Sequence, residues 1–186
     1  MTIGFRNAAE LEAGGNAGFL RVMPNPGGGE RAGALLQING RGEPIEFTFS
    51  RLQLPPAGLW SPTGLERHAL RAILASLFEA ARRSPLMLLC LAREMPSALF
   101  GEDLQVQLPV CRVAGAGDQV EAGPREIAEE LLQAGEGIRL LWTPRPPEPA
   151  SPAHSLLELL AARALLLEPF ERIPDGIREA LLPDPG

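Results

Sequence analysis

The side chains that could carry chemistry in this chain form an unusual set, because lysine and tyrosine are both absent. The sequence offers two histidines, two cysteines, four aspartates, nineteen glutamates and seventeen arginines. Without lysine there is no Schiff-base nucleophile, and none of the phosphate-binding lysines that P-loop NTPases and kinases use. Without tyrosine there is no phenolic acid, base or nucleophile. Several large enzyme classes are therefore excluded.

The histidines and cysteines do not fall into a catalytic or metal-binding motif. His68 and His154 stand far apart in the sequence, and no Gly-x-Ser-x-Gly nucleophile motif occurs. Cys90 and Cys111 each lie in an apolar run, which is typical of buried, reduced thiols. Two cysteines and two histidines at these positions do not supply the cluster of a zinc site. We therefore assign no catalytic, cofactor-binding or metal-binding residue and expect no cofactor.

Length and composition point to a folded bacterial protein of the cytoplasm. The chain has 186 residues, of which 45% are hydrophobic, enough for a core of its own. Its arginine-rich, lysine-free composition is typical of GC-rich bacterial coding sequences. No apolar signal segment and no run of about 18 apolar residues occurs, so we expect no membrane association. The net charge of -6 and the pI near 5.0 argue against nucleic acid as the favoured partner.

The N-terminal half predicts a flexible arm, three strands and a helix. Residues 1–17 show little periodicity and are expected to form the arm, and 18–23 a first strand. Apolar and polar residues alternate over 32–38 and 44–50, and the Asn39-Gly40 pair between them favours a tight hairpin turn. Ser61-Pro62 then begins an amphipathic helix over 62–83.

The C-terminal half predicts alternating strands and helices. We expect strands at 86–92, 105–113 and 138–143, a short helix at 124–134, a Pro-rich connection at 144–152, a leucine-rich helix over 152–168 and a last helix near 174–182. Together, residues 18–186 are predicted to form a single α/β domain with a mixed sheet, in which antiparallel hairpin strands precede alternating helices and strands.

This order of elements over residues 18–168 resembles the ribonuclease H-like fold. The resemblance implies acidic residues in the first strand, on the first helix, after the fourth strand and on the last helix, holding two divalent metals for phosphodiester cleavage. The acidic candidates are Glu66 and Glu79 on the first helix, Glu94 after the fourth strand and Glu158 on the leucine-rich helix. The first strand has Arg21 instead of an acid. The resemblance therefore implies a member without a complete metal site.

Several side chains could instead bind a partner. The candidates are Trp60, Arg67, Arg71, Arg82, Trp142, Leu156 and Leu160. The tryptophans flank Pro-rich sequence and could anchor an interface or close the edge of the core. The arginines could meet phosphates or an acidic partner, or form a solvated, ion-paired helix face. The leucine-rich helix could be buried within the chain or could contact another subunit.

Three functional hypotheses follow from these patterns. The favoured one is a non-enzymatic protein–protein interaction subunit of a bacterial complex, with a protein partner or a second copy of the chain bound to the leucine-rich helix. The alternative is a degenerate ribonuclease H-like domain associated with nucleic acid. A third is a small-ligand pocket at the carboxyl ends of the strands, near Arg93, Glu94 and Thr143. Whether the protein is an enzyme stays open, with the balance against it.

Overall fold

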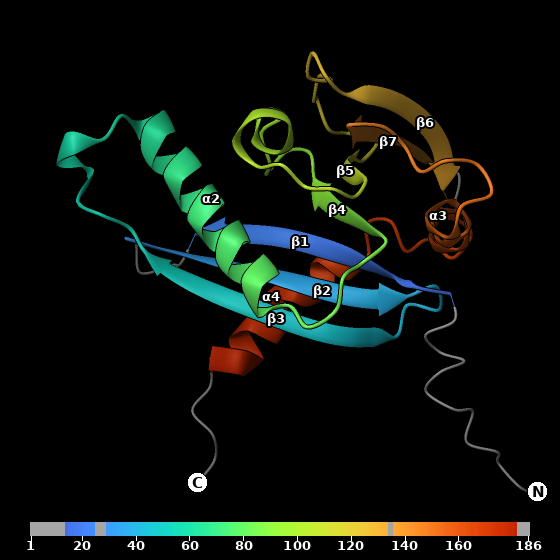
Figure 1. The fold of residues 1–186 in the computed structure, drawn as a ribbon, viewed down its shortest axis with the longest axis horizontal. Helices are drawn as coiled ribbons and strands as arrows, with labels where there is room; N and C mark the ends of the chain where they lie inside the picture. The colour runs from blue at the N-terminus through green and yellow to red at the C-terminus, as the bar shows by residue number, and fades with distance from the viewer. Residues whose placement is uncertain (1–13, 25–28, 134–135, 182–186) are drawn as a thin grey trace, which may run out of the picture.

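A computed structural model, which describes residues 14–24, 29–133 and 136–181, shows one mixed sheet with helices on both faces (Figure 1). Seven strands run in the order β3-β2-β1-β4-β5-β7-β6. The strands are β1 (Asn16–Pro24), β2 (Glu30–Asn39), β3 (Pro44–Gln53), β4 (Met87–Leu91), β5 (Val110–Ala114), β6 (Ile127–Gln133) and β7 (Glu136–Thr143). The helices are α2 (Pro62–Ala80), α3 (Pro152–Ala162) and α4 (Pro169–Leu181). The predicted mixed α/β class is confirmed.

The first three strands form an antiparallel meander, as the sequence predicts. β1 pairs with β2 and β2 with β3, both antiparallel. In the β2–β3 turn the Asn39 side chain accepts hydrogen bonds from the backbone N–H groups of Arg41 and Glu43, at 2.9 and 3.1 Å. Gly42 adopts a positive φ of 82°, which glycine does without steric cost. Local turn chemistry therefore fixes this hairpin.

The central strands β1, β4 and β5 are parallel, and α2 makes the crossover from β3 to β4. The Ser61 hydroxyl caps α2 by accepting from the Gly64 N–H at 3.1 Å, and Pro62 takes the first helical position. Because β1 and β4 are parallel and Leu20 lies opposite Cys90, the second half of β1 and the turn after β4 lie at the same edge of the sheet. This edge carries Arg21 and Glu94.

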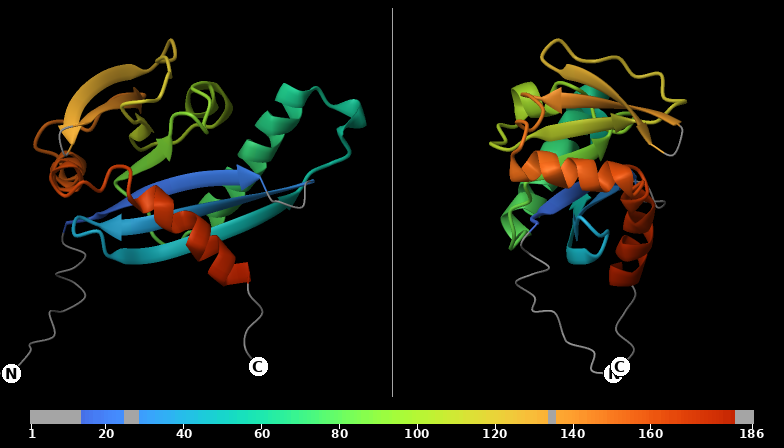
Figure 2. Two further views of the ribbon diagram at one scale, coloured as in Figure 1. Left: turned by 180° about the vertical axis from the view of Figure 1, so that it is seen from behind. Right: turned by 90° about the vertical axis from the view of Figure 1, so that its right-hand side faces the viewer.

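Helix α2 covers one face of the sheet, and α4 covers the other (Figures 1 and 2). On the α2 face, Leu70, Ile73, Leu74 and Leu77 pack with Leu20, Leu35 and Leu88. On the α4 face, Phe170 and Ile173 pack with Phe19 and Leu89, and the Phe19 and Phe170 rings meet edge to face at 5.2 Å. The two faces of β1 therefore belong to different cores.

The predicted helix at 124–134 is wrong, because this segment forms strand β6. Its Glu, Leu and Gln residues favour a helix in isolation. Pairing with β7 overrides that preference, with Ile127 opposite Trp142 and Gln133 opposite Glu136. The Trp142 indole N–H also donates to Glu129 at 2.9 Å. A long-range partner therefore decides the structure of this segment.

The C-terminal helices divide at a different place from the one predicted. The leucine-rich helix α3 ends at Ala162, and a turn in which Ala164 has a φ of 57° leads into α4. Pro169, the residue after the end of the predicted leucine-rich helix, instead opens α4. At the first helical position its missing N–H costs nothing, because an N–H there has no partner within the helix. The predicted strand over 105–113 is likewise shorter, and β5 begins only after Pro109.

β1 begins at Asn16, two residues before the predicted start, and residues 1–13 of the predicted arm lie outside the described residues. In the part of the chain that the structure describes, none of the helices has the length and apolar character that crossing a membrane requires.

The two cysteines are buried as reduced thiols on opposite faces of the sheet. Both are buried, in neighbouring parallel strands, and the Cys90 Sγ lies 3.7 Å from the Cys111 carbonyl oxygen. Burial raises the pKa of Cys90 from 9.0 to about 12, although the nearby Arg112 guanidinium opposes the shift. Burial also raises the pKa of Cys111 well above its ordinary value. The native protein therefore keeps both thiols protonated.

Because the chain has no lysine and no tyrosine, its stability at alkaline pH depends directly on the ionisation of the two thiols. With no lysine or tyrosine, and arginine protonated to above about pH 12, only the cysteines titrate between their unfolded and folded pKa values. The unfolded thiols ionise first, so stability is retained below pH 9 and falls above it. The expected slope is about 1.4 kcal/mol per pH unit for each thiol. Urea denaturation across this range checks it. A Cys90→Ala/Cys111→Ala protein should show no such fall, and an equal fall there would contradict the assignment.

Candidate functional site

An arginine near the middle of β1 forms the centre of the candidate site. Arg21 projects from the same face of β1 as Phe19 and meets Glu94, which lies in the turn after β4. The Arg21 Nε lies 3.1 Å from both carboxylate oxygens, and Nη2 lies 2.9 Å from Oε1. The two side chains are 20% and 21% exposed. The pair is therefore charge-neutral, bidentate and largely withdrawn from solvent.

The third partner of Arg21 comes from helix α4 and depends on a proline. The Arg21 Nη1 donates to the Phe170 carbonyl oxygen at 3.0 Å. In a regular helix that carbonyl accepts from the N–H four residues later, but the residue there is Pro174, which has no N–H. Pro174 therefore leaves the Phe170 carbonyl without a helical donor, and the guanidinium supplies one.

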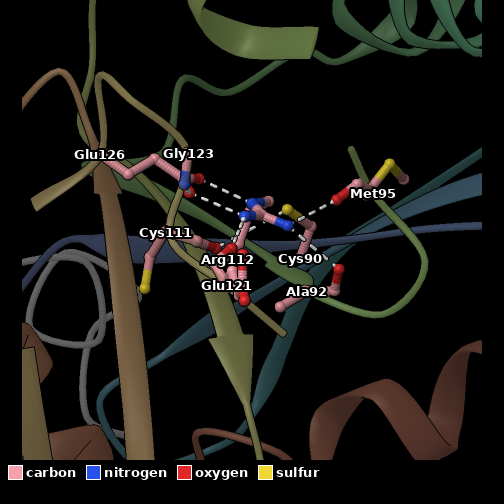
Figure 3. Close-up of polar contacts among 8 residues, drawn as sticks. All are labelled: Cys90, Ala92, Met95, Cys111, Arg112, Glu121, Gly123 and Glu126. Atoms are coloured by element: carbon pink, nitrogen blue, oxygen red, sulfur yellow. Dashed lines mark hydrogen bonds and ion pairs between the residues drawn. The ribbon is translucent and has the colours of Figure 1, made fainter. Parts of the chain in front are cut away.

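The turn that carries Glu94 is held by a second, buried arginine (Figure 3). Arg112 of β5 is 4% exposed, and its Nη1 donates to the carbonyl oxygens of Ala92 and Met95, at 3.1 and 3.0 Å. Its Nε and Nη2 meet the Glu126 carboxylate at 2.6 and 2.7 Å. Because Ala92 and Met95 flank Arg93 and Glu94, Arg112 fixes the turn from which Glu94 reaches Arg21.

The residues of this site do not fit a divalent metal. The ribonuclease H-like arrangement implied by the sequence requires a carboxylate on the first strand, and here a guanidinium stands in that strand and bonds the carboxylate after β4. A guanidinium carries a positive charge and has no lone pair to donate. Among the described residues, no group of three or more His, Cys, Asp or Glu side chains could hold a metal ion.

The other expected carboxylates do not join Glu94. Glu66 on α2 pairs with Arg31 at 2.9 Å, and Glu79 is exposed near the end of the same helix. Glu158 is exposed on α3, 3.6 Å from His154. The structure therefore brings one of the four expected acidic positions to Arg21. Sequence reasoning noticed Arg21 as a missing acid and missed that it pairs with Glu94.

The residues proposed for a small-ligand pocket are separated. Arg93 lies 3.6 Å from Asp118 beside Glu94, at the carboxyl end of β4. Thr143 ends β7, which is antiparallel to β5, and sits opposite Val110 at the start of that strand. Thr143 is therefore at the other edge of the sheet, so the idea that these three residues share a pocket is wrong.

The predicted partner-binding residues fall into two groups. Trp142, Leu156 and Leu160 are at most 1% exposed and contribute to the core on the α4 face. Trp60, Arg67, Arg71 and Arg82 are exposed, on or next to α2. Leu156 and Leu160 are therefore covered within the chain, although Leu159 of the same helix is 45% exposed, and only the exposed group of predicted residues remains as a predicted binding surface.

Three of the exposed residues gather at the N-terminal half of α2. The Trp60 and His68 rings stack at 4.9 Å with a tilt of 40°, and Arg67 Nε donates to Asp103 at 3.0 Å. This hydrogen bond, together with the charges of Arg67 and Arg71, lowers the pKa of the Asp103 carboxyl. Asp103 is therefore ionised and anchors Arg67, while Arg71 adds a further positive charge.

Known proteins resemble this chain in structure but not in sequence. No protein-family model matches the sequence, and no curated protein matches it in sequence. The structure is similar to Endonuclease V from Streptomyces avermitilis, with a TM-score of 0.55, 14% identity, and 90% of this chain and 83% of that chain covered. It is also similar to the catalytic domain of human Endonuclease V, with a TM-score of 0.53, 12% identity, and 96% and 91% covered. The fold is ribonuclease H-like.

This likeness corrects two predictions made from the sequence. The favoured function, a non-enzymatic protein-interaction subunit, is wrong, because the architecture is shared with endonucleases and supports the nucleic-acid-associated alternative. The prediction that nucleic acid is a disfavoured partner is also wrong for the same reason. It relied on the net charge of the whole chain, which does not report on the charge of one surface.

Removing Arg112 should strongly destabilise the fold. In Arg112→Met the Glu126 carboxylate, 2% exposed, would be left buried without its cation. Loss of one member of a buried pair costs about 3–5 kcal/mol. Arg112→Met/Glu126→Gln should recover part of this loss, because no buried charge remains. Urea denaturation of the wild type, the single variant and the double variant measures both the loss and the recovery of stability. Equal stabilities for the single and double variants would contradict the role given to the buried Glu126 charge.

The proline and the arginine should be energetically coupled. Pro174→Ala supplies an N–H to the Phe170 carbonyl, so Arg21→Met should cost less in that background than in the wild type. The expected coupling is about 1.5–3 kcal/mol, the worth of one hydrogen bond to a charged group. A double-mutant cycle of unfolding free energies measures it. Ile173→Val, a neighbouring change in α4 that leaves the backbone bond intact, serves as the control and should add independently.

Proposed function

We propose that this protein is a nucleic-acid-associated domain of the ribonuclease H-like fold that does not cleave by the metal-dependent route. The observation that carries the proposal is the Arg21–Glu94 pair, at 2.9–3.1 Å, in the place where the fold calls for two carboxylates. The likeness to endonuclease V supports nucleic acid as the ligand class. The ion pair supports the loss of the metal site.

Electrostatics explains why an arginine in place of the first-strand carboxylate disfavours metal binding. Two carboxylates in one site repel each other and attract a divalent cation. Here the guanidinium neutralises Glu94 and donates to both of its oxygens, which occupies the lone pairs that a metal would use. A cation entering this site would first have to displace Arg21 from both Glu94 and the Phe170 carbonyl.

The proposal also includes the domain organisation and the cellular compartment of the protein. Residues 18–186 act as one domain, and the two free, buried thiols suit the reducing cytoplasm of a bacterium. No cofactor is required by any residue discussed above. The proposed activity is therefore binding, in the compartment that contains the nucleic acid.

Binding and cleavage assays with Mg²⁺ or Mn²⁺ test the proposed function. We expect oligonucleotide binding that weakens as salt rises, no metal-dependent cleavage, and no change in affinity when EDTA is added. Cleavage that requires Mn²⁺ and disappears in Glu94→Gln would overturn the proposal. Glu158→Gln on α3 is the matched control, because its carboxylate lies away from Arg21.

A reverse substitution gives a readout that does not depend on activity. Arg21→Asp restores a first-strand carboxylate beside Glu94, so the variant should be less stable than the wild type without metal and should gain thermal stability when Mn²⁺ is added. The wild type should show no such gain. Equal Mn²⁺-induced shifts in the melting temperature of both proteins would contradict the role given to Arg21.

A further inference from the structure

We infer that a groove on the outer side of α2 binds single-stranded nucleic acid by stacking a base on Trp60, an inference that rests on the proposed function. The groove has a volume of about 590 Å³ and is lined by Trp60, Arg67, His68, Arg71, Ala75 and Leu104. This volume falls within the range of about 300–1,000 Å³ typical of small-ligand pockets.

The aromatic wall of the groove is positioned before any ligand arrives. Trp60 is 40% exposed although it is a large apolar side chain, and it precedes the Ser61 cap of α2. His68, two turns into the helix, packs against it with the ring centroids 4.9 Å apart and the planes tilted by 40°, so one side of the indole is supported. An exposed aromatic ring held in this way loses little conformational entropy when a flat ring stacks on its open side.

The basic side of the groove supplies the charge that a nucleic acid needs. Arg67 is held by Asp103 through its Nε at 3.0 Å, and Arg71 lies one helical turn further along the same side of α2. Both guanidinium groups line the groove, and Arg71 is exposed, so cationic donors stand beside the indole within an acidic chain. Positive charge beside an exposed aromatic ring is the combination that single-stranded nucleic-acid sites use.

The groove lies at the same end of the sheet as the Arg21–Glu94 pair. Arg31 is opposite Pro24, the last residue of β1, and its guanidinium pairs with Glu66 in the first half of α2. Asp103 follows Glu94 by nine residues in the connection to β5, within the π-helical turn Leu99–Asp103. The groove lies on the α2 face of the sheet, whereas Arg21 contacts Phe170 on the α4 face, so the two sites share an end of the sheet but not a face.

Single strands are favoured over duplex because stacking needs an exposed base face. In a duplex both faces of a base are covered, and the ring of Trp60 could reach one only after unstacking. The groove therefore predicts a preference for single-stranded DNA or RNA with little sequence selectivity.

Tryptophan fluorescence of the full chain tests the inference, because the two tryptophans differ in exposure. Trp142 is 0% exposed and Trp60 is 40% exposed, so quenching by oligodeoxythymidylate reports on Trp60. We expect quenching by the single strand, little by a duplex, and a dissociation constant about 5- to 150-fold weaker in Trp60→Ala. Trp60→Phe, which keeps a ring, should lose less.

The arginines provide a second, independent readout and the control. Arg71→Ala should reduce the slope of log affinity against log salt by about 0.7, the value for one phosphate on a single strand. Arg82→Ala, an exposed arginine just after α2 and away from the groove, should leave both affinity and slope unchanged. Equal effects of the two substitutions would count against a site at Arg71.

The outcomes separate this inference from the proposed function. Oligonucleotide binding that survives unchanged in Trp60→Ala overturns the groove and leaves the proposed function standing. A preference for duplex without quenching of Trp60 overturns the groove in the same way. If no nucleic acid binds to the wild-type protein at low salt, the proposed function fails and the groove fails with it.

Discussion

The Arg21 guanidinium is the interaction on which the candidate site depends, because it joins three elements that are distant in the sequence. It binds Glu94 after β4 and the Phe170 carbonyl of α4 from the middle of β1. A charged group with little exposure is tolerated only when its donors are satisfied, so the positions of the turn, the strand and the helix are mutually constrained. Pro174 contributes because it has no backbone N–H, so the Phe170 carbonyl has no helical donor and Arg21 can bind it.

Both central cations are arginines that lysine could not replace. Arg112 donates through Nε, Nη1 and Nη2 to Glu126 and to the carbonyls of Ala92, Met95 and Glu121. Arg21 uses the same three nitrogens. A lysine ammonium has three donors on one atom and cannot address acceptors that lie on different sides of a planar fork. The lysine-free composition therefore coincides with a structure in which a buried ion pair at Arg112 and a partly buried one at Arg21 both use guanidinium geometry.

The parts of the fold that the sequence predicts are those decided by neighbours along the chain. The Asn39 turn and the Ser61-Pro62 start of α2 are set by bonds between residues at most four apart. β6 is not predictable in this way, since only its register with β7 converts a helix-favouring segment into a strand. The candidate site depends on contacts across 73 and 149 residues. The one local signal was Pro174, which indicates an unpaired carbonyl at Phe170 but not the donor that fills it.

The Arg21–Glu94 pair also bears on where nucleic acid can bind. A metal-dependent centre screens the repulsion between its own carboxylates and a phosphate backbone with bound cations. Here Glu94 is neutralised internally, so no metal ion is needed for a phosphate to approach this edge. The same pairing engages Arg21, which therefore offers no unbalanced charge to a phosphate. In the binding mode proposed above, the attraction comes from positive charge elsewhere, and Arg67 and Arg71, which both line the Trp60 groove, are the side chains proposed to supply it.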